Sequence, residues 1–401
     1  MYKLYCRAFQ SVLKLGTYFM LWRTPKLLEG KNSLGQLPRL IKNKEINSVL
    51  IVTDKGISSL GLMNSLLKGL EDHDIKYCVY DKTVPNPTID NIEEALKLYY
   101  SNKCKGIIAF GGGSPMDCAK GVGARIARPQ KMIPQMKGLL KVLKTIPPLF
   151  AIPTTAGTGS EATIAAVITN QETHEKYAIN DLVLIPKYAV LDPALTVGLP
   201  PHITSTTGLD ALTHAVEAYI GRSNTKETKE LSRKAVNLIF DNLFEAYSNG
   251  TNLVARENMQ KASFYAGIAF TRAYVGYVHA LAHPLGGFYG TPHGLANAVI
   301  LPYVLEYYGE PAHKPLAELA DLIGISEKMD NTEEKALKFI DAIKKLNQSM
   351  EIPETIGGIK EKDIPTMSDR AFKEANPLYP VPRILSREDL IKLYDLIRVK
   401  I

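Results

Sequence analysis

Three of the eight histidines of the chain lie close together, in the stretch GYVHALAHPLGGFYGTPHGLANA (276–298). His279 and His283 are four residues apart and therefore share one face of an expected helix, and His293 follows in a turn rich in glycine and proline. Asp210 and His214 show the same spacing in TTGLDALTHAVEAYI. A carboxylate and several imidazoles together suit a divalent transition metal. These residues predict a metal site.

The residues alone leave the choice of ligands open. Glu217 lies on the same helical face as His214 and would serve equally well, and an Asp four residues before a His is often only an ion pair. The chain contains no HExxH sequence, which excludes the common metalloprotease pattern.

A second kind of chemistry is indicated by the glycine-rich stretch GIIAFGGGSPMDCAK (106–120), which follows an expected strand. Ser114 is expected to cap the next helix, with Pro115 at the first helical position and Asp117 completing a pattern like a capping box. Glycines before a helix N-terminus suit a pyrophosphate, although the stretch is neither GxGxxG nor a Walker sequence. A tight turn without a ligand is the alternative.

A second loop, IPTTAGTGSEAT (152–163), favours the nucleotide interpretation. It also follows an expected strand, and it offers the hydroxyl groups of Thr154, Thr155, Thr158 and Ser160. Two such loops at strand C-termini are typical of nucleotide sites in open α/β sheets. Asp54 ends the strand-like run SVLIVTD, and its spacing from the glycines predicts a helix cap or turn former.

The elements that position these residues change character along the chain. Up to residue 201, short β-branched or aromatic runs alternate with helical segments, which predicts a dinucleotide-binding α/β domain (1–201) with a mostly parallel sheet. The runs lie at 48–54, 76–81, 105–113, 148–155 and 187–193. Between them, 128–144 is expected to be a solvated basic insertion. From 202 to 401, apolar residues three and four apart predict an all-helical domain with the metal site.

Composition narrows the class of protein. The length of 401 residues favours two domains, and a net charge of +7, scattered along the chain, does not indicate a nucleic-acid partner. Four cysteines without a CxxC pair are typical of reduced thiols in a cytoplasmic protein.

The N-terminal segment is basic and apolar. Residues 1–28 contain no acid and carry Lys3, Arg7 and Lys14 among apolar residues, a pattern typical of an amphipathic helix on a membrane surface or on a partner. The apolar run 15–22 is too short to span a bilayer. We expect an added helix packed on the body of a soluble protein.

Together the motifs resemble the iron-containing (group III) alcohol dehydrogenase family, from about residue 27 to the C-terminus. The first 26 residues lie outside the resemblance. The matching motifs are VTDKG (52–56), PNPT (85–88), GGGSPMDCAK (111–120), IPTTAGTGSE (152–161), LDP (191–193), TGLDALTHAVEAY (207–219), HALAHPLGGFYGTPHGLANA (279–298) and NPLYPVPRILSREDLIKLY (376–394).

The resemblance implies a dehydroquinate synthase-like architecture, and it implies a role for each of the site residues. The metal, Fe²⁺ or alternatively Zn²⁺, is held by Asp210, His214, His279 and His293, and His283 lies beside it as the catalytic proton carrier. NAD is bound by Asp54, Asn86, Gly111, Gly112, Gly113, Ser114, Pro115, Thr154, Thr155, Thr158, Lys176 and Leu195. Asp54 implies NAD rather than NADP, since relatives that prefer the phosphorylated cofactor often have a small residue there.

The predicted function is reversible hydride transfer between NAD and a primary alcohol or aldehyde, with the metal polarising the substrate oxygen. A homodimer or higher homo-oligomer is expected. The alternatives are polyol oxidation like that of glycerol dehydrogenases, an NAD-using lyase or cyclase of the dehydroquinate synthase-like fold, and a binding protein without turnover. Aromatic residues near the metal motifs favour an apolar alcohol, although Tyr274 and Ala166 differ from some relatives and leave its identity open.

Overall fold

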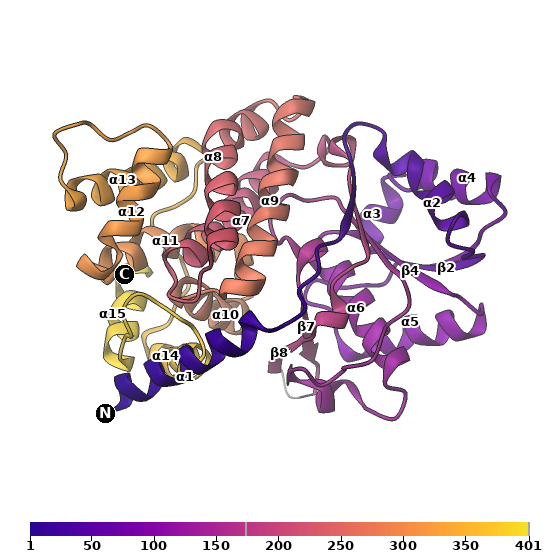
Figure 1. Cartoon of the computed structure of the whole chain (residues 1–401), viewed down its shortest axis with the longest axis horizontal. Helices are drawn as coiled ribbons and strands as arrows, with labels where there is room; N and C mark the ends of the chain where they lie inside the picture. Colours follow the sequence, from indigo (N-terminus) through magenta and orange to yellow (C-terminus); the bar gives the residue numbers. More distant parts are fainter. Residues whose placement is uncertain (173–174, 400–401) are drawn as a thin grey trace. The chain divides into compact units, whose positions relative to one another are not determined.

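The computed structural model of the chain describes residues 1–172 and 175–399. It forms two compact units, Leu21–Gly198 and Met1–Met20 with Leu199–Ile401 (Figure 1). The first unit is α/β and the second is helical, which confirms the predicted fold class. The first 20 residues belong to the helical unit, whereas the sequence analysis grouped them with the α/β domain.

The α/β unit is built on a parallel six-stranded sheet in the order β1-β9-β6-β4-β2-β3. Every strand pairing recorded in this sheet is parallel. The five strand-like runs of the sequence correspond to five of these strands, and the short edge strand β1 had no sequence signal. The strands are β1 (Lys26–Glu29), β2 (Ser48–Val52), β3 (Lys76–Tyr80), β4 (Gly106–Gly111), β6 (Leu149–Pro153) and β9 (Tyr188–Leu191).

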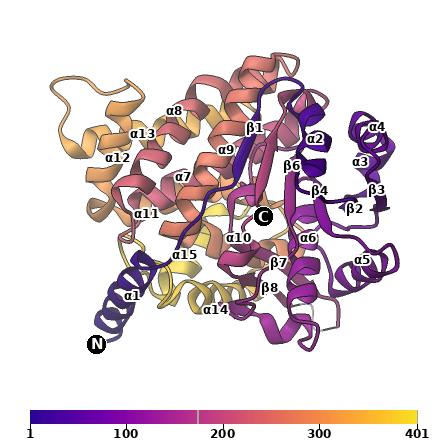
Figure 2. The ribbon, with the colours of Figure 1, turned by 45° about the vertical axis from the view of Figure 1, so that its right-hand side comes forward.

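Helices cover both faces of this sheet (Figure 2). Successive residues of a strand point to opposite faces, so Leu50 and Ile107 enter one core while Ile51 and Ile108 enter the other. The first core also contains side chains of α5 (Ile89–Ser101) and α6 (Gly113–Ala127), and the second contains those of α2 (Leu37–Lys42) and α4 (Asn64–Asp72). Burial on both faces explains why these strands read as continuous apolar runs.

A smaller sheet, in the order β5-β8-β7, completes the unit. Its strands are β5 (Gly138–Leu139), β7 (Ala165–Asn170) and β8 (Glu175–Asn180). The prediction that 128–144 is a solvated insertion was wrong for part of that segment. Ile133, Met136 and Val142 are fully buried in the core shared with α5 and α6, because β5 pairs with β8 and draws the segment inward.

The helical unit is centred on α7 (Pro201–Ile220), which is buried at every position from Gly208 to Ile220. A helix buried on all sides needs neighbours on all sides, and α8, α9, α11 and α12 contact it. The other helices are α1 (Tyr2–Tyr18), α8 (Lys226–Ser248), α9 (Leu253–Ala273), α10 (Tyr277–Tyr289), α11 (His293–Tyr308), α12 (Glu310–Leu322), α13 (Thr332–Ser349), α14 (Ile364–Ala375) and α15 (Arg387–Ile397).

Within 1–172 and 175–399, each helix is too short or too polar to cross a membrane.

Candidate functional site

The central helix α7 carries three ionisable side chains into the core of the helical unit. Asp210, His214 and Glu217 are 2%, 5% and 3% exposed. Burying such groups is unfavourable unless each has a polar partner, so their presence on the buried part of α7 indicates a function. Burial raises the pKa of Asp210 above its ordinary value.

Two further helices bring histidines to Asp210. His279 comes from α10, and His293 is the first residue of α11 rather than part of a turn. Their Nε2 atoms lie 3.9 and 3.7 Å from the Asp210 Oδ1. The backbone of α11 passes very close to α7 here, because a Cβ added at Gly294 would lie 2.3 Å from the Thr206 carbonyl oxygen. Only glycine permits this approach.

The spacing of these three side chains fits a metal ion. Their donor atoms all lie within 4.8 Å of one another, and one carboxylate with two imidazoles suits iron or zinc. Two ligands about 2.1 Å from a tetrahedral ion lie roughly 3.4 Å apart, close to the separations observed here.

Glu217 supports His279 from the opposite side of the ring. Its Oε2 lies 2.6 Å from the His279 Nδ1, and its Oε1 accepts a hydrogen bond of 2.8 Å from the Val278 N–H. Burial alone disfavours a charged imidazole, but the Glu217 carboxylate outweighs it, and the pKa of His279 is raised. With Nδ1 donating to Glu217, Nε2 keeps its lone pair toward Asp210, as in carboxylate–histidine–metal sites. Glu217 thus lies behind His279 and outside the group of three, whereas the residues alone had left it as a candidate ligand.

His214 is the predicted ligand that lies apart from this group of three. Its ring stacks between Phe270 and His279, with centroid distances of 4.0 and 4.5 Å. It is therefore adjacent to the centre, but its donor atoms are not among those that meet within 4.8 Å.

Sequence reasoning missed Asn297, which lies one turn after His293 on α11. Its Nδ2 donates a 2.6 Å hydrogen bond to the Asp210 Oδ1 and lies 3.3 and 3.1 Å from the Nε2 atoms of His279 and His293. The only signal was the spacing of four residues from His293, which carries little weight for an amide side chain.

His283 lies beside the same histidines but has its own partner. Its ring stacks on that of His293 with centroids 5.2 Å apart, and its Nδ1 lies 2.7 Å from the Glu374 Oε1. The Tyr379 hydroxyl donates a 2.8 Å hydrogen bond to the same oxygen. The His283 side chain is 30% exposed, so these hydrogen-bonded side chains are accessible to water at His283. Glu374 and Tyr379 had no sequence signal toward His283.

In the α/β unit, the glycine loop lies between β4 and α6. Gly111 has a φ of 145°, which side chains rarely adopt, and Gly112 is the residue before the helix. The expected cap at Ser114 was wrong. The sharp turn at Gly111 starts the helix at Gly113, the N-cap residue is Gly112, which has no side chain to cap the helix, and the Ser114 Oγ instead accepts from the Asn86 N–H at 3.2 Å. An uncapped helix N-terminus is suited to a phosphate group.

The threonine loop packs against the glycine loop. A Cβ added at Gly113 would lie 3.0 Å from the Thr158 Cγ2, and one added at Gly112 would lie 3.4 Å from the Thr155 Oγ1. The Thr154 N–H donates to the Gly111 carbonyl at 3.1 Å, and among the described residues its buried Oγ1 has no partner. A buried hydroxyl at such a loop is suited to a polar ligand.

Asn86 and Lys176 also meet at this loop. The Lys176 Nζ donates a 2.7 Å hydrogen bond to the Asn86 Oδ1, and the Asn86 backbone has a φ of 57°. The structure thus brings Asn86 and Lys176 to the loop that contains the predicted glycines and Ser114, against which Thr154, Thr155 and Thr158 also pack.

Asp54 and Leu195 are placed differently. Asp54 caps the short helix α3 (Lys55–Ser59) through a 2.9 Å bond from the Ile57 N–H, as its spacing predicts. Its other oxygen faces the glycine loop, 3.6 Å from the position of a Cβ on Gly111. Leu195 is 7% exposed and packs in the core with α2 and α4.

A buried lysine ties α6 to the threonine loop. The Lys120 Nζ donates to the Ser160 Oγ at 3.0 Å, the Thr163 Oγ1 at 2.9 Å and the Ala165 carbonyl at 2.8 Å. Burial lowers the pKa of Lys120 to about 8 and raises the pKa of Glu161 to about 7. Sequence reasoning did not single out either residue.

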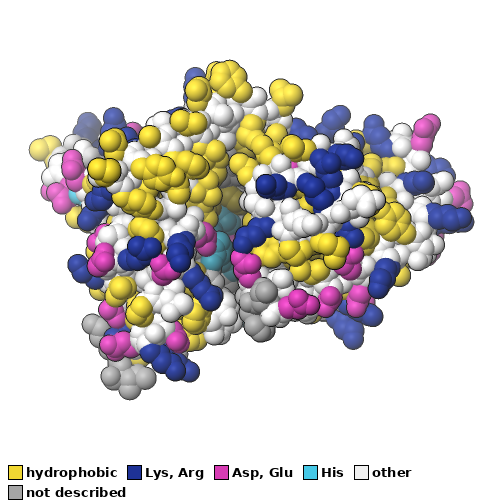
Figure 3. Space-filling model, turned by 90° about the horizontal axis from the view of Figure 1, so that it is seen from below, with side chains coloured by type: hydrophobic (Ala, Val, Ile, Leu, Met, Phe, Trp, Pro, Cys, Tyr) yellow, Lys and Arg dark blue, Asp and Glu magenta, His cyan; other side chains and the backbone are white. Residues whose placement is uncertain are grey.

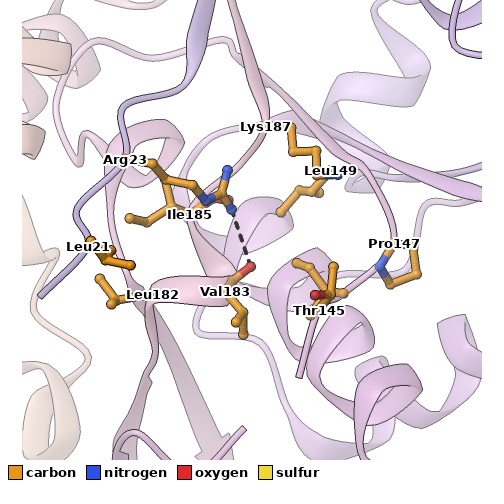
Figure 4. A pocket seen from close by; sticks show the side chains of 10 residues that line it. Leu21, Arg23, Thr145, Pro147, Leu149, Leu182, Val183, Ile185 and Lys187 are labelled. Atoms are coloured by element: carbon orange, nitrogen blue, oxygen red, sulfur yellow. Dashed lines mark hydrogen bonds between the residues drawn. The ribbon is translucent and has the colours of Figure 1, made fainter. Parts of the chain in front are cut away.

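A cavity of about 240 Å³ in the α/β unit contains none of the predicted cofactor residues (Figure 4). Its walls are mostly apolar, and the Arg23 guanidinium at its edge donates to the carbonyls of Val183, Ile185 and Pro186. The Arg23 guanidinium is therefore already bonded to the backbone.

Comparison with known proteins places both units in one family. Residues 24–193 match the family model for iron-containing alcohol dehydrogenase, and residues 204–397 match the model for the C-terminal part of the Fe-containing alcohol dehydrogenase family. The first 23 residues lie outside both matches.

Similar proteins of known activity cover nearly the whole chain. A 1,3-propanediol dehydrogenase of Klebsiella pneumoniae is 38% identical over 365 residues, covering 90% of this chain and 93% of that protein. Alcohol dehydrogenase 4 of Saccharomyces cerevisiae is 41% identical over 350 residues, covering 86% and 90%.

Solved structures of such enzymes also match nearly the whole chain. A 1,3-propanediol oxidoreductase has a TM-score of 0.89 at 35% identity, covering 94% of this chain and 99% of that one. A sulfoacetaldehyde reductase from Bifidobacterium kashiwanohense in complex with NAD⁺ has a TM-score of 0.82 at 27% identity, covering 94% and 99%. These findings confirm the predicted family, and this chain belongs to the iron-containing alcohol dehydrogenases, oxidoreductases that act on CH–OH groups.

Proposed function

We propose that this chain oxidises a small primary alcohol, or reduces the corresponding aldehyde, with NAD as the hydride carrier and Fe²⁺ as the metal. The observation that carries the proposal is the convergence of Asp210, His279 and His293 inside the helical unit, with Glu217 behind His279. A divalent ion held there supplies Lewis-acid polarisation of the substrate oxygen. We include His214 as the fourth ligand because it stacks directly on His279.

The residues of the chain supply binding and proton transfer. His283 donates from Nδ1 to Glu374, which leaves its Nε2 as the acceptor for the proton that an alcohol loses. The Glu374 carboxylate stabilises the imidazolium that forms, and the Tyr379 hydroxyl holds that carboxylate in place. The 30% exposure of the His283 side chain allows the proton to pass on to water.

The substrate class is supported by the relatives and by the surroundings of the metal residues. The similar proteins are named for 1,3-propanediol and alcohols, and the Phe270 ring packs on His214. Tyr274 has a φ of 67°, a conformation uncommon outside glycine that occurs at functional sites. We propose that Tyr274 borders the alcohol.

The ligand assignment is tested by His279→Ala. The purified variant should contain little metal and should not produce NADH from short primary alcohols, whereas wild type reconstituted with Fe²⁺ or Zn²⁺ should do both. Ser232→Ala, a change at a buried position of α8 outside the proposed ligand set, serves as the folding control. Full metal occupancy in His279→Ala would show that the assignment is wrong.

We further propose that NAD is preferred over NADP because of Asp54. The Asp54 carboxylate faces the glycine loop and would accept hydrogen bonds from a ribose diol. A 2′-phosphate would bring negative charge against it. Two like charges at about 4 Å repel by roughly 4 kcal/mol at an effective dielectric near 20, and even a third of that gives about a tenfold preference.

Two variants separate the charge from the helix cap. Asp54→Gly removes both, and Asp54→Asn removes the charge while an amide oxygen still caps the Ile57 N–H. Both should raise kcat/KM for NADP relative to NAD. A wild-type enzyme that favours NADP would refute this role of Asp54.

A reducing compartment such as the cytoplasm is our proposal for its location, because all four cysteines are free thiols. The homodimer or higher homo-oligomer stays a prediction, which sedimentation equilibrium of the purified enzyme would test.

A further inference from the structure

The segment 376–382, which carries Tyr379, lies between α14 and α15 and belongs to neither a helix nor a strand. Its sequence is NPLYPVP, and its three prolines have no backbone N–H. The segment therefore cannot pair its own carbonyl groups as a helix does, and these carbonyls need donors from other parts of the chain. The position of Tyr379 depends on what supplies those donors.

Gln10, on α1, supplies two of them. Its side-chain amide donates to the Pro377 carbonyl at 3.1 Å and to the Tyr379 carbonyl at 2.7 Å. The Arg7 Nη1 donates to the Gln10 Oε1 at 2.9 Å, which turns the N–H groups of the amide toward the two carbonyls. Gln10 is 4% exposed, so water cannot easily replace these hydrogen bonds.

Arg7 supplies donors to the end of the same segment. Its guanidinium donates to the carbonyls of Val381 and Pro382 at 2.7 and 2.8 Å. A guanidinium carries several donors in a fixed plane, so it can bond to two carbonyls and to Gln10 at once. Through Gln10 and Arg7, α1 holds the backbone on both sides of Tyr379.

The helix α1 also contacts α14, which carries Glu374. The Tyr2 ring stacks on the Phe372 ring with centroids 5.6 Å apart, and Figures 1 and 2 show α1 next to α14. The Glu374 Oε1 is bonded to the Tyr379 hydroxyl and to the His283 Nδ1. Figure 3 shows histidine side chains that reach the surface, in line with the partial exposure of His283. The two groups behind His283 therefore lie on parts of the chain that α1 contacts.

We propose that Gln10 and Arg7 are positioning residues for proton transfer and that they act through Tyr379. The inference rests on the proposed role of His283 as the proton acceptor. By holding the Tyr379 backbone, α1 keeps the hydroxyl 2.8 Å from the Glu374 carboxylate, which in turn orients the His283 ring. Both positioning residues lie outside the two family matches, so this support is an addition of this chain to the site that the family shares.

Gln10→Met tests the proposal, because it removes both donors and keeps the length of the side chain. The single-turnover rate of NADH formation from a short primary alcohol should fall about tenfold, less than the roughly 10²-fold that a misplacement of about 1 Å can cost. The KM values for NAD and the alcohol and the metal content should not change. Gln348→Met, a matched change at an exposed glutamine of α13, should behave like wild type.

Arg7 is tested in the same assay. Arg7→Met should lower the rate in the same direction, and Arg7→Lys should recover part of it, since an ammonium group can still donate to a carbonyl. Lys3→Met removes an exposed cation from the same helix and should leave the rate unchanged.

The position of the segment is measured without metal, NAD or turnover. In hydrogen–deuterium exchange, peptides that cover 376–382 should exchange faster in Gln10→Met than in wild type, because the 2.9 Å bond from the Val381 N–H to the Tyr379 carbonyl loses its support. Peptides from α13 should exchange as in wild type. Circular dichroism should match wild type, which shows that the variant folds.

A double-mutant cycle identifies the route. Tyr379→Phe removes the hydroxyl that bonds to Glu374. If Gln10 acts through this hydroxyl, adding Gln10→Met to Tyr379→Phe should lower the rate less than about twofold further, since residues that act as one unit are not additive.

The results that would overturn the proposal differ from those that would overturn the proposed function. An unchanged rate in His283→Ala would contradict both. A loss of rate in His283→Ala and Tyr379→Phe, with wild-type rate and exchange in Gln10→Met, would overturn this inference alone. So would a tenfold loss in Gln10→Met that persists in the Tyr379→Phe background, because Gln10 would then act by another route.

Discussion

Replacing Glu217 by Gln tests the metal centre without touching a proposed ligand. The Glu217 carboxylate is 3% exposed and accepts two hydrogen bonds, from the Val278 N–H and from the His279 ring. A glutamine of the same shape has one acceptor oxygen. If that oxygen stays with the Val278 N–H, the amide group donates to the His279 Nδ1, and the proton of the imidazole moves to Nε2.

The magnitude follows from that change of tautomer. An Nε2 that carries a proton has no lone pair for a metal, so the variant binds metal only by breaking the new hydrogen bond or turning the ring. Loss of such a supporting carboxylate costs about 10–100-fold in metal affinity, which corresponds to roughly 1.4–2.7 kcal/mol. The fold should persist, since the Val278 N–H keeps its acceptor.

The assay is metal affinity of the purified protein, measured by competition with a chromophoric chelator, together with metal content after dialysis. Glu318→Gln is the matched control, because Glu318 belongs to the same unit and accepts a hydrogen bond from Tyr219 rather than from His279. Circular dichroism should match wild type for both variants. Metal affinity within a factor of two of wild type in Glu217→Gln would refute the role assigned to this carboxylate.

Two more predictions concern proton transfer and pH. His283→Ala should keep its metal and lose about 10²–10⁴-fold in kcat, as is usual for a general acid–base residue, and loss of metal instead would make His283 a ligand. Burial raises the pKa of Glu161 from 4.5 to about 7, so the folded protein holds this proton more tightly than the unfolded chain. The contribution of Glu161 to the free energy of unfolding is fully present below about pH 4.5 and is lost as pH rises to about 7. The total loss is on the order of 3 kcal/mol. Between pH 5 and pH 7 the unfolding temperature should therefore fall less in Glu161→Gln than in wild type or in the exposed control Glu29→Gln. Parallel profiles of unfolding temperature against pH would contradict this.

Local pattern was sufficient for much of the fold. The five apolar runs of the main sheet are buried on both faces, so each run reads as a strand without knowledge of its neighbours. The pairs Asp210/His214 and His279/His283 follow from the pitch of a helix, and the glycine and threonine loops follow from strand ends. These features depend on residues within one or two turns of each other.

Packing decided the rest, because it joins residues far apart in the chain. Glu217 and His214 share a face of α7, and only the position of α10 shows that Glu217 bonds to the His279 Nδ1 while His214 stacks on the ring. Glu374 reaches His283 from α14, 91 residues away. The buried part of 128–144 and the contacts of α1 with 376–382 were likewise invisible to periodicity, since a pattern reveals that a face is apolar or polar but not what it packs against.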